Sequence, residues 1–167
     1  ARFSPIMREV SAFAQKGGLV LGVCNGFQVL CEAGLLPGAL LHNEGQQFIC
    51  RNVFIRAQTR NTPLTSAVND GPLNIPIAHG EGRYYADAAT IKALNDNDQV
   101  LFRYCDAEGR LRDDANPNGS VENIAGVCNA GRNVFGMMPH PERAADERLG
   151  NTDGKALFRS LLQGVPA

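Results

Sequence analysis

The stretch GLVLGVCNGFQVLCEAG, residues 18–34, places a cysteine between two glycines where an apolar strand changes into a helix. Gly22, Cys24 and Gly26 fit the pattern G-x-nucleophile-x-G, a tight strand-to-helix turn that holds its central side chain above the sheet. That side chain also lies at a helix N-terminus, where unpaired N–H groups favour a thiolate. The spacing predicts that Cys24 is a nucleophile. The alternative, a small residue that merely fits a crowded turn, is disfavoured by the paired glycines.

A cysteine nucleophile needs a base to take its proton. The chain offers three histidines for this role: His42, His79 and His140. Two of them precede a carboxylate by two residues, in the motifs HGEG (79–82) and PHPE (139–142). In extended backbone this spacing places both side chains on one face, where the carboxylate can orient the imidazole.

The prolines on either side of His140 favour the second motif. Each proline fixes its own φ and pushes the residue before it toward an extended conformation, which makes this segment rigid. The flexible glycines of HGEG suit a binding loop better than a rigid base. We therefore predict His140 as the base and Glu142 as its partner. A solvated histidine in a proline-rich loop is the alternative.

Alternating helices and strands surround these motifs. Ser4 as N-cap and Pro5 at the first helical position predict a helix that ends at 17–18, before an apolar strand at 19–23. Strand composition recurs at 48–57, 73–79, 99–106, 124–130 and 133–140, with a hairpin turn expected at 129–133.

The last segment, 151–165, predicts a helix capped near Thr152 that turns Leu157, Leu161 and Leu162 inward. A strand that is apolar throughout, as at 19–23, is typical of a parallel sheet buried on both faces. We predict one α/β domain spanning 1–167, with a mostly parallel sheet flanked by helices. Such a sheet normally opens with a strand of its own, so we expect its N-terminal part to be missing from this sequence.

Composition excludes several classes of function. A chain of 167 residues with 44% hydrophobic content can bury the core of one domain. Its 16 basic and 17 acidic residues give no electrostatic footprint for nucleic acid or an anionic membrane. The apolar runs are also shorter than the roughly 20 residues that a bilayer span requires. We predict a cytoplasmic protein with neither nucleic-acid nor membrane partners.

The five cysteines are an odd number without a C-x-x-C pair, which indicates reduced thiols and no zinc site. No metal site of another kind is expected either. The four cysteines outside the elbow lie in helical or strand-like runs and are interpreted as packing residues: Cys31, Cys50, Cys105 and Cys128.

Four motifs taken together resemble one family. These are GVCNGFQVLCEAGLLPGALL (22–41), HGEGRYY (79–85), NPNGSVENIAGVCN (116–129) and GMMPHPERA (136–144). In this order they are similar to the glutaminase subunit of phosphoribosylformylglycinamidine synthase, a class I glutamine amidotransferase of purine biosynthesis. The resemblance runs over nearly the whole chain. It implies a flavodoxin-like amidotransferase fold with a nucleophile elbow.

The resemblance implies hydrolysis of glutamine to glutamate and ammonia by the triad Cys24, His140 and Glu142. Cys24 attacks the side-chain amide, His140 protonates the leaving ammonia and later activates water, and Glu142 orients His140. The residues expected to contact the substrate are Gly22, Asn25, Gln28, His79 and Gly80. The N–H of Asn25 is expected to supply one oxyanion donor, and the second would come from residues outside this sequence.

The resemblance also implies partners. Ammonia passes to a large synthase subunit that binds ATP and formylglycinamide ribonucleotide, and a small accessory subunit is often present. We therefore expect no cofactor in this chain, and ATP with magnesium on the synthase subunit. The chain has no phosphate-binding G-x-x-x-x-G-K motif, in line with this expectation.

Two other classes of function are considered. A catalytically silent subunit that only docks on the synthase would keep the fold and lose a member of the triad. A cysteine hydrolase on a related α/β scaffold would use the same elbow but would not require Gln28 or the downstream motifs.

Overall fold

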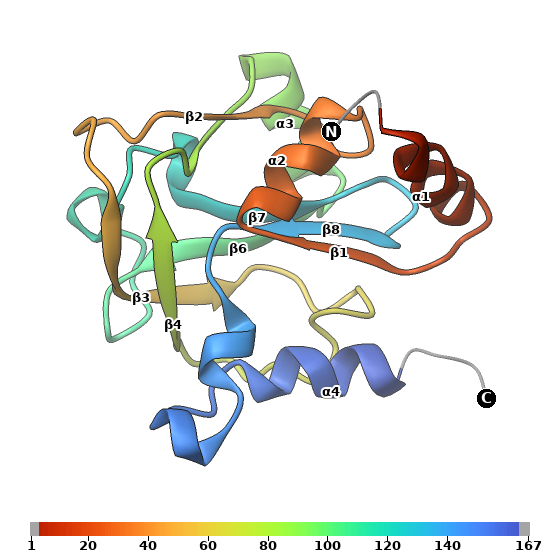
Figure 1. Cartoon of the computed structure of the whole chain (residues 1–167). Helices are drawn as coiled ribbons and strands as arrows, with labels where there is room; N and C mark the ends of the chain where they lie inside the picture. The colour runs from red at the N-terminus through yellow and green to blue at the C-terminus, as the bar shows by residue number, and fades with distance from the viewer. Residues whose placement is uncertain (1–3, 164–167) are drawn as a thin grey trace.

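The computed structural model describes residues 4–163, and Figure 1 shows helices on both faces of a strongly twisted sheet. The helices are α1 (Pro5–Gln15), α2 (Asn25–Glu32), α3 (Ala88–Asp96) and α4 (Lys155–Gln163). The strands are β1 (Val20–Val23), β2 (Ala39–Leu41), β3 (Ile49–Ala57), β4 (Leu73–His79), β5 (Arg83–Tyr85), β6 (Val100–Cys105), β7 (Ile124–Cys128) and β8 (Val134–Met137). Four 3-10 helices complete the described elements: η1 (Asp113–Ala115), η2 (Val121–Asn123), η3 (Pro141–Ala144) and η4 (Glu147–Leu149).

The main sheet has the order β1-β8-β7-β6-β3-β4, and β2 pairs with β5 in a separate ribbon. β1 and β8 are parallel, with Val23 opposite Met137. The other four pairings of the main sheet are antiparallel. The α/β class is confirmed, but the expectation of a mostly parallel sheet is wrong for residues 4–163. The predicted turn at 129–133 does join β7 to β8, and so short a connection can link only antiparallel neighbours.

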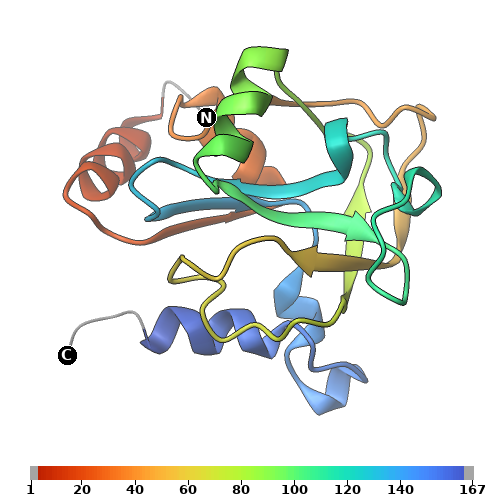
Figure 2. The same ribbon diagram turned by 180° about the vertical axis from the view of Figure 1, so that it is seen from behind.

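Apolar side chains are buried on both faces of the sheet. On one face α2 and α3 cover a cluster that includes Phe27 and Ile91, and on the other α4 contributes Leu157 to a second cluster. Figures 1 and 2 show this arrangement from opposite sides. Because helices cover both faces, even antiparallel strands such as β6 are buried at every residue, which explains why strand direction could not be inferred from their apolar composition.

The two terminal helices, α1 and α4, each differ from the predicted helix. α1 begins at Pro5 as predicted, but the side chain of Ser4 makes no capping hydrogen bond. In α4, Leu157 and Leu161 contribute to the core, whereas Leu162 is 76% exposed and was wrongly predicted to face inward. Leu161 lies four residues after Leu157 and shares its face, while Leu162 lies about 100° further around the helix. Residues 164 and 165 of this predicted helix lie outside the described part.

The cysteines outside the elbow lie where the sequence placed them. Cys105 in β6 and Cys128 in β7 are buried, and Cys31 in α2 is partly buried against the core. Cys50 is exposed on β3, so its interpretation as a packing residue is wrong. Over residues 4–163, no helix combines the length and apolar character needed to cross a membrane.

Candidate active site

Cys24 occupies the turn between β1 and α2 in a strained conformation, with φ of 52° and ψ of −109°. The turn is tight because a Cβ on Gly22 would lie 2.6 Å from the backbone carbon and oxygen of Gly26. A Cβ on Gly26 would meet nothing within 4 Å. Of the two glycines that predicted the elbow, Gly22 is therefore the one whose lack of a side chain the described structure requires.

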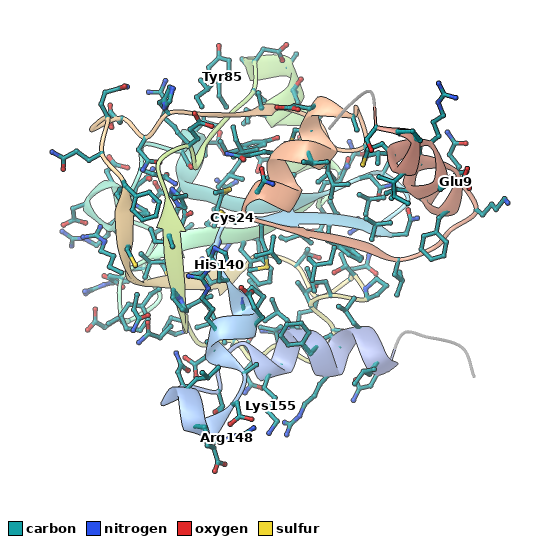
Figure 3. All side chains as sticks on the ribbon, viewed as in Figure 1. Glu9, Cys24, Tyr85, His140, Arg148 and Lys155 are labelled. Carbon is teal, nitrogen blue, oxygen red and sulfur yellow. The ribbon has the colours of Figure 1, made fainter. Side chains whose placement is uncertain are left out.

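The carboxyl ends of β1 and β8 bring the nucleophile and the predicted base to one edge of the sheet. The N–H of Cys24 donates to the carbonyl of Met137 at 2.8 Å, directly where β8 ends. His140 follows three residues later, and its own N–H donates to the carbonyl of Pro76 in β4 at 2.8 Å. In the view of Figure 3, Cys24 and His140 both lie toward the carboxyl ends of β1 and β8.

His140 is oriented by Glu142. Its ring Nδ1 lies 2.6 Å from Oε1 of Glu142, so the carboxylate fixes the proton on Nδ1. Nε2 is buried and has no hydrogen-bond partner among residues 4–163, which leaves it available as a base. The predicted pairing forms, but the segment after His140 is the 3-10 helix η3 rather than extended chain. A single tight turn brings the two side chains together.

Burial raises the pKa of the Cys24 thiol. The N–H of Asn25 and the guanidinium of Arg143 act in the opposite direction, while the carboxylate of Glu142 raises the pKa further. The N–H of Asn25 at the helix N-terminus does favour the thiolate, as expected, but loss of hydration outweighs it, so the pKa of Cys24 is raised overall. A thiol in this environment requires a neighbouring base to become nucleophilic.

His79 does not form the alternative pair with Glu81. Its Nδ1 lies 3.1 Å from Oδ1 of Asn43, whereas the carboxylate of Glu81 lies 3.4 Å from Nε2 of the exposed His42. Burial, together with the nearby His140, lowers the pKa of His79 to about 4. So weakly basic an imidazole is a poor general base at neutral pH, and the geometry favours His140.

A pocket of about 340 Å³ opens beside the nucleophile. Its lining residues come from the elbow and from the segment around β4: Cys24, Gln28, His42, Ala78, His79, Gly80 and Glu81. Four residues that the sequence predicted for the site therefore share this pocket: Cys24, Gln28, His79 and Gly80. The other four predicted site residues do not line it: Gly22, Asn25, His140 and Glu142. Gln28 is fixed there, because its Nε2 donates to the carbonyl of Glu81 at 2.7 Å.

Three larger surface hollows, of about 350, 420 and 620 Å³, contain none of the predicted site residues. Among residues 4–163, no group of three or more histidine, cysteine or acidic side chains is arranged to hold a metal ion. The residues that sequence reasoning missed are His42 and Asn43 after β2, Glu81 as a pocket residue, and Asn118. Their partners lie far away in the sequence, so no local spacing could have identified them.

Fold and site together define a class of protein: an α/β domain with a cysteine on a nucleophile elbow beside a histidine–carboxylate pair. The chain belongs to the CobB/CobQ-like glutamine amidotransferase domain family, whose model matches residues 1–156. The class predicted from the motifs is thus confirmed.

Curated relatives are similar over nearly the whole chain. It is 55% identical over 163 residues to "Phosphoribosylformylglycinamidine synthase subunit PurQ" of Koribacter versatilis, covering 97% of this chain and 71% of the relative. It is 55% identical over 166 residues to the protein of the same name from Salinibacter ruber, covering 99% of this chain and 71% of the relative. The resemblance to glutaminase subunits of this synthase is confirmed.

Solved structures support the same fold. A chain of PurLQS from Thermotoga maritima matches with a TM-score of 0.82 and 43% identity, over 97% of this chain and 69% of that one. A glutamine amidotransferase from the same organism matches with a TM-score of 0.55 and 16% identity, over 93% of this chain and 66% of that one, and shows the fold alone.

Proposed function

We propose that this chain hydrolyses glutamine to glutamate and ammonia, with Cys24, His140 and Glu142 as the catalytic triad. The observation that carries the proposal is the buried His140, held by Glu142 at 2.6 Å and lying three residues after Met137, whose carbonyl accepts the N–H of Cys24. Nε2 of His140 takes the proton of the thiol as Sγ of Cys24 attacks the side-chain amide carbon. The same proton passes to the leaving nitrogen, which departs as ammonia and leaves a thioester.

Hydrolysis of the thioester repeats the proton transfer with water as the nucleophile. His140 takes a proton from water, the hydroxide adds to the thioester carbonyl, and the proton returns to the departing sulfur. The products are glutamate and the free thiol. Glu142 stays ionised throughout and stabilises the imidazolium that forms in each half of the reaction.

The raised pKa of Cys24 supports the assignment of Cys24 as the nucleophile and His140 as the base that takes its proton. A thiol whose burial disfavours ionisation gives up its proton efficiently only when the acceptor is already in place. Asn25 contributes at the same point, since its N–H interacts with the sulfur and lies where an oxyanion donor is needed immediately after the nucleophile.

The pocket beside the elbow is proposed as the glutamine site. Gln28, His79 and Gly80 line it together with the nucleophile and supply polar groups for a polar substrate. Gly22 contributes through the shape of the elbow, because its missing side chain allows the turn to close.

The relatives suggest where the ammonia goes. They are named as subunits of phosphoribosylformylglycinamidine synthase, and the similar solved structure from Thermotoga maritima is that of PurLQS. We propose that this chain delivers ammonia to a large synthase subunit, which uses ATP and magnesium to convert formylglycinamide ribonucleotide to formylglycinamidine ribonucleotide in purine biosynthesis. A small accessory subunit completes the proposed complex, and this chain itself carries no cofactor.

Replacing Cys24 with alanine tests the proposal, because it removes the sulfur and leaves Gly22 in place. The reconstituted complex should make no product from glutamine, yet should work with an ammonium salt at high pH, where free ammonia is abundant. Cys50→Ala, at an exposed cysteine on β3, is the matched control and should leave both nitrogen sources usable. Glutamine-dependent synthesis by the Cys24→Ala complex would exclude Cys24 as the nucleophile.

A further inference from the structure

Residues 78–81 line the pocket, and together with Gly82 they form a segment, the 78–82 wall, that Asn43 after β2 holds in place. Asn43 is completely buried. Its side-chain Nδ2 donates to the carbonyls of His79 at 2.9 Å and Gln47 at 2.8 Å. Its Oδ1 accepts from the N–H of Gly82 at 3.0 Å and lies 3.1 Å from Nδ1 of His79. The backbone N–H of Asn43 also donates to the carbonyl of Gly80 at 2.9 Å.

This network fixes the tautomer of His79. The two carbonyls can only accept, so Nδ2 of Asn43 must face them, and its Oδ1 is left facing the ring. An amide oxygen cannot donate, so Nδ1 of His79 carries the hydrogen. Nε2 of His79 then bears a lone pair, and it is buried without a hydrogen-bond partner in the described part of the chain.

Gly82 restrains the imidazole ring of His79 from a second side. The His79 ring packs so closely over Gly82 that a Cβ there could not fit. The carbonyl of Gly82 accepts from Nδ2 of Asn118 at 2.8 Å, so both polar backbone groups of this glycine are held by buried asparagines. The ring is therefore fixed in position as well as in tautomer.

We infer that Asn43 is a positioning residue of the glutaminase site, which fixes the 78–82 wall and holds His79 in the tautomer with a hydrogen on Nδ1 and none on Nε2. This inference rests on the proposed function and deepens it, because Asn43 itself is not among the residues that line the pocket. The fixed wall lines the pocket beside Cys24, so its displacement should weaken substrate binding more than it slows bond breaking.

The tautomer can be measured on the unaltered protein. Long-range proton–nitrogen NMR of the histidine side chains should show a protonated Nδ1 and a bare Nε2 for His79 at neutral pH. The signals of His79 are assigned by comparison with the spectrum of His79→Gln, in which they are absent. A protonated Nε2 on a neutral His79 would overturn the inference, and this outcome depends neither on a variant that folds nor on any activity.

Kinetics provide the second test. Asn43→Ala should raise the KM for glutamine by about tenfold or more while kcat stays within about threefold, and the NMR signals of His79 should lose the pattern of one fixed tautomer. The matched control is Asn133→Ala, at the opposite end of β8. Asn133 also makes several side-chain hydrogen bonds, including two donated to the carbonyls of Ala14 and Gly18.

Loss of stability alone would affect both variants, but only the change at Asn43 should alter KM and the His79 signals. An unchanged KM in Asn43→Ala, or an equal rise in Asn133→Ala, would overturn the positioning role. Failure of the proposed function is seen separately, as glutamine hydrolysis that survives Cys24→Ala. If Asn43→Ala does not fold, the tautomer in the unaltered protein decides.

Discussion

Replacing Gly22 with alanine tests the geometry of the elbow. The added Cβ would lie 2.6 Å from the backbone carbon and oxygen of Gly26 and 2.6 Å from Cδ1 of Leu30. Two of these atoms belong to the backbone, so the turn itself must move, and overpacking of this kind costs about 1–3 kcal/mol. In a chain of this size each kcal/mol lowers the Tm by about 2–4 °C, so we expect a fall of roughly 2–12 °C.

Gly26→Ala is the matched control, because a Cβ there meets nothing within 4 Å and alanine favours the helix. Its Tm should be unchanged or slightly higher. Thermal unfolding followed by circular dichroism measures both variants, and labelling by an electrophilic glutamine analogue reports whether Cys24 is still presented correctly. We expect slower labelling in Gly22→Ala. If Gly22→Ala were as stable as Gly26→Ala and labelled at the normal rate, the steric account of the elbow would be wrong.

Two further predictions concern the histidines. Glu142→Gln keeps the size of the side chain but removes the charge that stabilises the imidazolium of His140, so kcat for glutamine hydrolysis should fall by up to about 10⁴-fold with little change in KM. The exposed Glu108→Gln should have no effect, and a normal kcat in Glu142→Gln would contradict the triad. His79 has its pKa lowered from 6.5 to about 4 in the folded chain, so the unfolded chain binds the proton more readily, and this contribution to stability is complete above pH 6.5 and is lost as the pH falls toward 4. Urea unfolding at pH 7 and pH 4.5 should therefore show a smaller loss of stability for His79→Gln than for the unaltered chain, and equal losses would refute the assignment.

The local parts of the site could be predicted from the sequence. Two glycines two residues to either side of Cys24 indicate an elbow, and at Gly22 the turn leaves no room for a Cβ. The spacing of His140 and Glu142 also sufficed, although the turn that joins them is a 3-10 helix. Each of these features lies within a few residues of chain, so short-range geometry determines it.

Features that depend on distant contacts could not be predicted. Asn43 acts on His79 and Gly82, which lie 36 and 39 positions away, and an isolated asparagine after a short strand gives no sign of that role. The sign of the Cys24 pKa shift depends on how deeply the folded chain buries the sulfur. The direction of the strands could not be inferred either, since apolar composition is the same for parallel and antiparallel strands once helices cover both faces.

The single-domain organisation over 1–167 stays a prediction, as do the roles assigned to individual residues. Family membership and the fold are established.

The parallel pairing of β1 with β8 also governs when the site can exist during folding. Val20 pairs with Val134, so the two strands join residues 114 positions apart. Contacts of such long range close late, because the entropy of the intervening chain is lost before they add stability. On the ribosome, a growing chain displays Cys24 long before β8 and His140 have been made. Under the proposed mechanism, a partly synthesised chain carries Cys24 without His140, so it should not hydrolyse glutamine until β8 and the residues after it have been added.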